Sequence, residues 1–327
     1  MKATTLMKAA LVAGSLSFLA GSAYSQQSAV SGAGGYTTES LGVGFNLMGV
    51  SLHNPVALSG TFDSEAGATL TDADVDFSAV LTDPNATYLL EILDGTQAGA
   101  VAEIESLTAT TVTVGASGLG AGAATYQIRA AGTLEDIFGD SLAGAVAVPG
   151  ATTDRVWLPK DGGGFDQYFR HSGTGQYRSV ALPFAATTGT PVFYPDALFV
   201  QVADTAKDVV ITGMVKTTDT VAAAIEGFNL VGVTPPVGST FGNSGMGAFL
   251  TAGGVVPTAT TDRVWLPVAG GGFNQYFING TGDWRTVALP FGASQNDTEL
   301  TSGIFIQRND AGDTGGALTV PGFYANL

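Results

Sequence analysis

The sequence predicts an all-β protein of two homologous, small antiparallel β-sandwich or barrel modules, the first carrying an inserted β-subdomain. Three observations lead to this prediction. The segment 151–184 recurs at 259–291 with 25 of 33 aligned positions identical. Both copies contain short runs in which apolar and polar residues alternate, the two-residue period of a strand. Glycine is abundant, with 46 residues, and gathers between these runs, where tight reversals need positive φ.

The first residues predict export. Lys2 and Lys8 precede an apolar stretch, and small residues lie just before Gln26. This pattern is typical of a secretory signal peptide over 1–25, which is too short to anchor the chain across a membrane. Residues 26–36 are expected to be a flexible N-terminus. We therefore expect the mature protein in the periplasm, on the cell surface or outside the cell.

Composition restricts the partners and the source of stability. Twelve Lys and Arg residues stand against 28 Asp and Glu residues, for a formal net charge of −16, and no basic cluster is visible. This balance argues against nucleic acid as a partner. The chain has no cysteine, so its stability must come from a packed core rather than from disulfides.

The first module is expected at 37–217. It opens with GFNLMGV at 44–50, and an insertion at 57–132 separates this strand from the long repeat. The insertion has strand composition in four runs: 87–93, 100–106, 110–116 and 125–130. One short helix is predicted at 133–138, because Thr133 can cap its start and Gly139 can end it. Nothing else in the mature chain is predicted to be helical.

The second module is expected at 222–327, without the insertion. It opens with GFNLVGV and closes with FIQR, which answers FVQV in the first module. Within the long repeat, RVWLP and FDQYF alternate as strands. RSVALPF is also predicted to be a strand, with Val180, Leu182 and Phe184 on one face.

The order of motifs is similar to that of a known group of proteins. The chain presents GFNL[MV]GV, then YLLEILDGTQAGAVAEIES, TLEDIFG, DRVWLP followed by GGGF and QYF, and a closing FVQV or FIQR. This order resembles a secreted β-rich repeat family of verrucomicrobial and planctomycete-type bacteria that has no known activity. The resemblance covers most of the mature chain and implies export and modular repetition, without catalytic residues or a cofactor.

Repeated aromatic residues are the first candidate binding groups. The tryptophans are Trp157, Trp265 and Trp284, and Tyr168 and Tyr276 accompany the first two. Such Trp/Tyr pairs on an exported sheet could stack on sugar rings. The other interpretation, which we favour, is core or inter-module packing, because burying a Trp side chain contributes about 4–6 kcal/mol as an upper estimate.

A repeated Asp-Arg dipeptide is the second candidate. A half-buried arginine needs a carboxylate partner. We predict cross-strand ion pairs between Asp154 and Arg178 and between Asp262 and Arg285, with ligand clamping as the alternative role.

Catalytic and metal-binding patterns are weak. His53 and His171 are the only histidines, and neither has the spacing of a zinc site. Acidic turns offer weak Ca²⁺ candidates at Asp72, Asp74, Asp76, Asp310 and Asp313. We therefore expect no cofactor and no resident metal, with Ca²⁺ as the one alternative.

A comparison of the two copies argues against an enzyme. Lys160, Asp166, Arg170 and His171 are replaced by Val268, Asn274, Ile278 and Asn279 in the second copy. A duplicated active site would be expected to keep its titrating groups. A glycosidase with two carboxylates remains open, because spacing in space is not visible in the sequence.

The favoured function is a non-catalytic structural protein of the cell envelope or the extracellular matrix, acting through self-association. The alternative is an extracellular polysaccharide-binding module that uses the repeated Trp/Tyr pairs.

Overall fold

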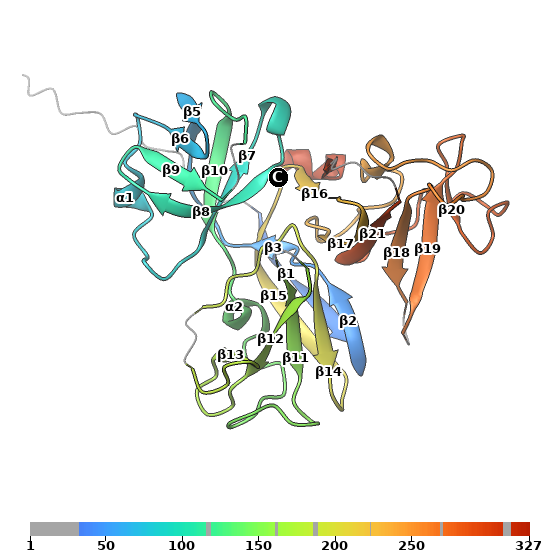
Figure 1. The fold of residues 1–327 in the computed structure, drawn as a ribbon, viewed down its shortest axis with the longest axis horizontal. Coiled ribbons are helices and arrows are strands. Elements are labelled where there is room, and N and C mark those ends of the chain that lie inside the picture. The colour runs from blue at the N-terminus through green and yellow to red at the C-terminus, as the bar shows by residue number, and fades with distance from the viewer. Residues whose placement is uncertain are drawn as a thin grey trace, which may run out of the picture. The chain divides into compact units, whose positions relative to one another are not determined.

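The computed structural model describes residues 33–327, apart from 116–118, 161–162, 186–188, 223, 269–270 and 310–314. It is 42% strand and 6% helix, in several antiparallel sheets of which none closes into a barrel. The all-β prediction is therefore confirmed, and Figure 1 shows the elements in chain order. The predicted signal peptide and residues 26–32 lie outside the described residues.

The first module contains a five-stranded antiparallel sheet in the order β13-β12-β11-β14-β2. These strands are Tyr177–Ser179, Phe165–Arg170, Arg155–Pro159, Leu198–Val202 and Gly44–Met48. One face is apolar, because Val156 and Val200 alternate with polar or aromatic neighbours along their strands. Both valines are fully buried in a core that also contains Tyr177.

The second module repeats this sheet. Its order is β20-β19-β18-β21-β17, over Trp284–Thr286, Phe273–Ile278, Arg263–Pro267, Gly303–Arg308 and Gly227–Gly232. Val264, Ile306 and Trp284 take the core positions. The two sheets thus have the same strand order.

The hairpin register is also the same in both modules. Trp157 pairs with Gln167 and Trp265 pairs with Gln275. The turn of the first hairpin includes Gly164 at φ 85°, and that of the second includes Gly272, also at φ 85°. A side chain at this φ would be strained, which explains why both copies keep glycine at this position.

The segment predicted as an insertion forms a seven-stranded antiparallel sheet in the order β4-β10-β7-β8-β9-β6-β5. The bounds are Val56–Thr61, Thr125–Ala130, Tyr88–Ile92, Val101–Leu107, Thr111–Val114, Thr69–Thr71 and Ser64–Ala66. This inserted subdomain has its own core, which includes Leu70, Phe77 and Tyr126. A 3-10 turn, η1, spans Gly95–Gln97.

The predicted short helix is present as α2, Leu134–Phe138. Thr133 and Asp136 form a reciprocal capping box, and Gly139 follows the last turn with φ 48°. The statement that nothing else is helical is wrong. A four-residue helix, α1, spans Phe77–Val80, and Asp76 caps it by accepting a hydrogen bond from the Ala79 amide.

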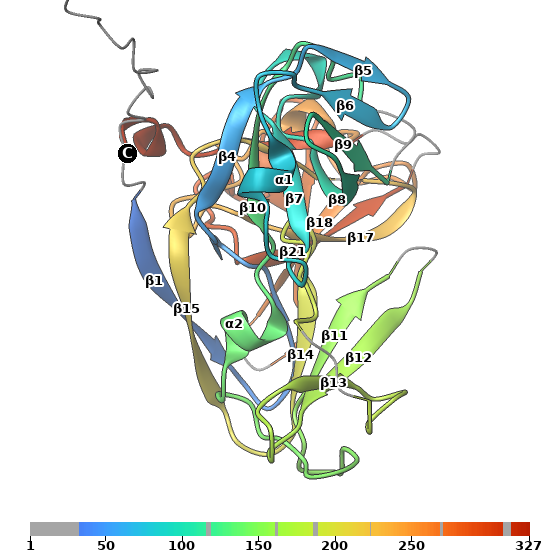
Figure 2. The ribbon, with the colours of Figure 1, turned by 90° about the vertical axis from the view of Figure 1, so that its left-hand side faces the viewer.

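A three-stranded sheet pairs β1 (Gly34–Leu41) with β15 (Lys207–Val215), and β15 with β3 (Leu52–His53). Figure 2 shows β1 and β15 running side by side, in line with their continuous register. Residues 34–36 are therefore in a strand, whereas we expected a flexible N-terminus to 36. The backbone pairing with β15 accounts for this order. The remaining elements are β16 Thr220–Ala222, η2 Met246–Ala248, β22 Gly316–Leu318 and η3 Gly322–Asn326.

The prediction that RSVALPF is one strand is wrong. The strands β13 and β20 end at Ser179 and Thr286, and the chain then turns. Both strands end four residues before the proline, and the turn is closed by the Leu182 amide donating to Ser179 O and the Leu289 amide donating to Thr286 O. The phenylalanines of these loops are largely exposed, 75% at Phe184 and 79% at Phe291.

Candidate functional site

The outer face of each five-stranded sheet carries a cluster of aromatic rings, which we call the aromatic strip. Its members are Phe45, Trp157, Phe165 and Phe199 in the first module and Phe228, Trp265, Phe273 and Phe305 in the second. The rings meet edge to face, a favoured geometry for aromatic pairs. The Phe45–Trp157 centroid distance is 5.4 Å and the Phe228–Trp265 distance is 5.5 Å.

The strip continues from one module to the other. Phe199 and Phe305 occupy equivalent positions in FVQV and FIQR, and their centroids lie 5.6 Å apart. The strip is only partly covered, because Phe45 is 58% exposed and Phe228 is 57% exposed. The rings of the strip therefore pack against one another and are still partly exposed to solvent.

The repeated GFNLxGV motif supplies the backbone contact beside this ring pair. The Gly232 amide donates across to Pro195 O of the first module at 2.8 Å, and within the second module the Val233 amide donates to Ser302 O at 2.7 Å. A Cβ atom at Gly49 would lie 2.0 Å from Ser302 O, and one at Gly232 would lie 2.4 Å from Tyr194 O. Only glycine permits such a close approach of backbones. We call this contact the glycine junction.

The predicted Trp/Tyr pairs do not form binding pairs. Tyr168 pairs in register with Val156, so it lies on the core face, opposite Trp157. Tyr276 is likewise in the second core, at 6% exposure. The reason is the hairpin register, which places Gln167 and Gln275 beside the tryptophans instead.

Trp284 belongs to the core rather than to the aromatic strip. Its ring stacks on Phe241 at 4.3 Å and the residue is 3% exposed. Its counterpart Tyr177 is fully buried and lies 6.1 Å from Phe138. For this pair of positions the packing interpretation is the correct one.

The predicted ion pair in the first module is also wrong in its partner. Asp154 accepts from the Ala143 and Ala203 amides at 2.7 and 2.8 Å, and Lys207 Nζ lies 3.8 Å from its carboxylate. Arg178 donates to Pro183 O instead. Strand β12 separates β11 from β13, which puts Arg178 about two strand spacings, roughly 10 Å, from the Asp154 end of β11.

The second module repeats this outcome. Asp262 accepts from the Thr251 and Asn309 amides, each at 2.8 Å, and pairs with Arg308 at 3.0 Å. Arg285 pairs with Asp283 and donates to Gly292 O. Both repeated aspartates are therefore loop anchors that tie the segment before the central strand to the strand beside it.

The repeated arginines of DRVWLP lie on the same outer face as the strip. Arg155 donates to Gln167 Oε1 at 3.4 Å, and Arg263 donates to Gln275 Oε1 at the same distance. Arg155 also pairs in register with Gln201, and Gln201 with Phe45, so these three residues form one row across β11, β14 and β2. The planar side-chain groups of Arg155 and Gln201 therefore lie in the same row as the exposed ring of Phe45.

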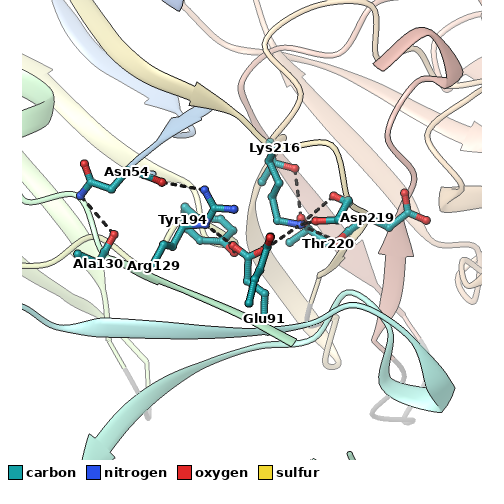
Figure 3. Close-up of polar contacts among 11 residues, drawn as sticks. Asn54, Glu91, Arg129, Ala130, Tyr194, Lys216, Asp219 and Thr220 are labelled. Atoms are coloured by element: carbon teal, nitrogen blue, oxygen red, sulfur yellow. Dashed lines mark hydrogen bonds and ion pairs between the residues drawn. The ribbon is translucent and has the colours of Figure 1, made fainter. Parts of the chain in front are cut away.

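A buried charge cluster, which sequence reasoning missed, joins the inserted subdomain to the first module. Figure 3 shows Glu91 between Arg129 and Lys216. Arg129 Nε lies 2.6 Å and Lys216 Nζ 3.7 Å from the Glu91 carboxylate, and Tyr194 donates to it. Lys216 also donates to the carbonyl oxygens of Thr218 and Asp219, each at 2.8 Å. The sequence feature that could have indicated this cluster is a charged residue within each of two strand-like runs, Glu91 in YLLEIL and Arg129 in TYQIRA.

The electrostatics of this cluster are those of a structural site. Burial alone would raise the pKa of Glu91, but the charges of Lys216 and Arg129 outweigh it and hold the pKa at about 2. Burial lowers the pKa of Lys216 to about 8 and that of the neighbouring His53 to about 3. The Glu91 carboxylate already interacts with two cations and the Tyr194 hydroxyl. With so low a pKa it is a poor general base near neutral pH.

The acidic calcium candidates have local roles. Asp72 is buried and accepts from the Tyr126 hydroxyl at 2.7 Å, and Asp76 caps α1. The backbone amide of Asp74 donates a hydrogen bond to the Asp72 carboxylate. Asp310 and Asp313 lie outside the described residues. In the part of the chain that the structure describes, no three His, Asp or Glu side chains are grouped so that they could hold a metal ion.

No family model, curated protein or solved structure matches this chain. Within the residues described, no helix has both the length and the apolar character needed to cross a membrane.

Proposed function

We propose that this chain is a non-catalytic, exported structural protein of the cell envelope or the extracellular matrix, built from a duplicated β-module. The glycine junction carries this proposal. Each module contacts the other through residues that both copies share. These residues are the equivalent glycines Gly49 and Gly232 and the equivalent phenylalanines Phe199 and Phe305. The duplicated motifs thus support packing of one module against the other rather than two separate sites.

The fate of the titrating groups supports the same proposal. Asp166 and Lys160 form an exposed ion pair at 3.6 Å in the first module, and Asn274 and Val268 replace them in the second. Exposed pairs of this kind contribute little to stability. The carboxylates that both copies share, Asp154 and Asp262, are occupied by backbone amides and a cation.

The experiment expresses the full chain in a bacterial host and follows its location and its assembly. We expect cleavage before Gln26, recovery outside the cytoplasm, and concentration-dependent association in sedimentation velocity, with ordered assemblies in electron microscopy. Uncleaved protein in the cytoplasm would contradict export. A strict monomer at high concentration, with and without Ca²⁺, would contradict the structural role.

Polysaccharide binding through the aromatic strip is the second candidate function, and the exposure of Phe45 and Phe228 favours it. Exposed rings beside Gln and Arg side chains combine apolar contact with oriented hydrogen bonding, as ligand sites do. Two equivalent rings would also raise avidity for a repeating polymer.

The double variant Phe45→Ala/Phe228→Ala tests this candidate. We expect it to lose retention in affinity electrophoresis through polysaccharide gels while its thermal unfolding stays close to that of the parent. The control is Phe184→Ala/Phe291→Ala, which removes two exposed rings of the Leu-Pro-Phe loops. Equal retention of the parent and the strip variant would exclude the strip.

A further inference from the structure

The first module has an open pocket of about 270 Å³ beside the row formed by Arg155, Gln201 and Phe45. Gly44, Gly150, Thr153, Arg155, Gln201 and Ala203 are among its lining residues. The pocket lies at the end of the sheet where Asp154 fixes the preceding loop through the Ala203 amide. The Ala203 side of the pocket is therefore held by a hydrogen bond from a backbone amide to the buried Asp154 carboxylate.

The second module carries larger side chains at the corresponding positions. Thr258 stands where the first module has Gly150, and Asn309 stands where it has Ala203. Asn309 donates to Thr261 O at 2.6 Å and accepts from Gln307 at 3.1 Å. The Asn309 side chain therefore bonds to Thr261 and Gln307. The counterparts of these two residues in the first module, Thr153 and Gln201, line the pocket. The two copies therefore differ in the side chains that stand at this place.

Two polar atoms on the outer face of this sheet, one of them on a residue that lines the pocket, have no hydrogen-bond partner among the described residues. Gln201 Oε1 and Trp157 Nε1 are buried without a hydrogen bond, whereas the equivalent Trp265 and Gln307 bond each other at 3.2 Å. An unsatisfied buried polar group costs about 1–3 kcal/mol, so it calls for an explanation. A ligand that bonds to Gln201 would supply one.

Arg155 provides the charge at this site. It is half-buried, and the ion pairs among the described residues do not include it, although the chain has 28 acidic residues. Among the residues that the structure describes, its side chain makes one hydrogen bond, the long one to Gln167 Oε1 at 3.4 Å. A guanidinium presents a planar fork that matches a carboxylate. An anion is therefore the ligand that the chemistry of Arg155 favours.

We propose that this pocket binds a carboxylate-bearing sugar unit of an acidic polysaccharide. Arg155 pairs with the carboxylate, Gln201 bonds to a ring hydroxyl, and the exposed ring of Phe45 packs against the apolar face of the sugar. This inference rests on the second candidate function and narrows it to a substrate class and to one module. A sulfated sugar presents a similar anion, so the test separates the two.

The test measures binding of a uronate oligosaccharide to the mature protein by titration calorimetry. The matched ligands are its carboxyl-reduced, neutral form and a sulfated oligosaccharide of the same length. We expect the neutral form to bind at least about tenfold more weakly, which corresponds to about 1.4 kcal/mol. We also expect the sulfated form to bind more weakly than the uronate, because a sulfate ester is tetrahedral and bulkier than the planar carboxylate for which the pocket is proposed.

The chain supplies its own control variants. Arg155→Gln and Ala203→Asn, which introduces the residue of the second module, are expected to lower the affinity at least about tenfold. Arg263→Gln, the equivalent change in the second module, is expected to leave it unchanged. Thermal unfolding of each variant verifies folding.

Three outcomes would overturn the inference. If Ala203→Asn binds as the parent does, the pocket is not the site. If Arg155→Gln and Arg263→Gln act equally, the site is not specific to the first module. If the neutral form binds as well as the uronate while Phe45→Ala/Phe228→Ala loses binding, the carboxylate inference fails and the polysaccharide candidate stands. Absence of binding by every ligand contradicts both.

Discussion

At the scale of single residues, the most consequential group is one buried carboxylate. Glu91 is 1% exposed and lies between two cations that are themselves buried, Arg129 at 3% and Lys216 at 2%. Taking such charges out of water is costly, and only their mutual contacts offset that cost. The cluster therefore specifies how the inserted subdomain meets the first module.

Removal of this carboxylate is expected to destabilise the protein strongly. Glu91→Gln leaves Arg129 and Lys216 buried without their anion, and breaking a buried pair in this way costs about 3–5 kcal/mol. Urea unfolding would measure the loss. Asp166→Asn is the matched control, because it removes an exposed carboxylate and introduces the residue of the second copy. Equal stability of the two variants would contradict a structural role for Glu91.

Single residues also explain why the predicted Trp157–Tyr168 pair and the predicted Asp154–Arg178 ion pair are not formed. Trp157 and Tyr168 lie on opposite faces because the hairpin pairs Trp157 with Gln167. A register shifted by one residue would have placed them together. Asp154 pairs with Lys207, which lies far along the sequence from the arginine that we expected. Alternation predicts which residues share a face of one strand, but the pairing between strands decides which residues meet.

At the scale of elements, the glycine junction governs how the two five-stranded sheets are joined. A side chain at Gly49 or Gly232 would collide with backbone atoms, which cannot move aside as a flexible side chain can. The motif GFNLxGV therefore has a packing reason for its second glycine.

Alanine at the junction tests this element. Gly49→Ala places a Cβ within 2.0 Å of Ser302 O, and overpacking of this kind costs about 1–3 kcal/mol or more. Gly35→Ala is the control, because a Cβ at Gly35 meets nothing within 4 Å. We expect a lower melting temperature and faster limited proteolysis for Gly49→Ala alone. Unchanged melting would show that the two segments do not approach as closely as described.

At the scale of the whole molecule, the buried titratable groups make stability depend on pH. The pKa of His53 is lowered by burial to about 3, below its ordinary value of 6.5, so the unfolded chain binds this proton first as pH falls. Its contribution is therefore present above pH 6.5 and is lost as pH falls toward 3. The low pKa of Glu91 adds a loss below pH 4.5.

The expected result is a decrease of about 2 kcal/mol in the free energy of unfolding between pH 7.5 and pH 5, arising from His53. Urea titrations at both pH values would measure it. His53→Asn removes the titrating ring and is expected to flatten the profile over this interval while leaving the steeper loss below pH 4.5. A parent protein that is equally stable at pH 5 and pH 7.5 would contradict this assignment.

The all-β class, four of the seven strands of the inserted subdomain (β7, β8, β9 and β10), the capped helix α2 and the matching segments of the two modules were predictable from the sequence. These features depend on neighbours in the chain, such as alternating side chains, a Thr cap or a glycine turn. Local patterns did not reveal α1, which is one turn long, or the end of the RSVALPF strand.

The aromatic strip, the glycine junction, the Glu91 cluster and the pocket at Arg155 arise from contacts that form only in the folded chain. Each of these joins residues far apart in the sequence, as Phe199 joins Phe305 and Glu91 joins Lys216. Strand pairing, register and the packing of one face against another set such contacts, and these are properties of the whole fold. The alternation of side chains along one strand is the same whichever partner strand lies beside it.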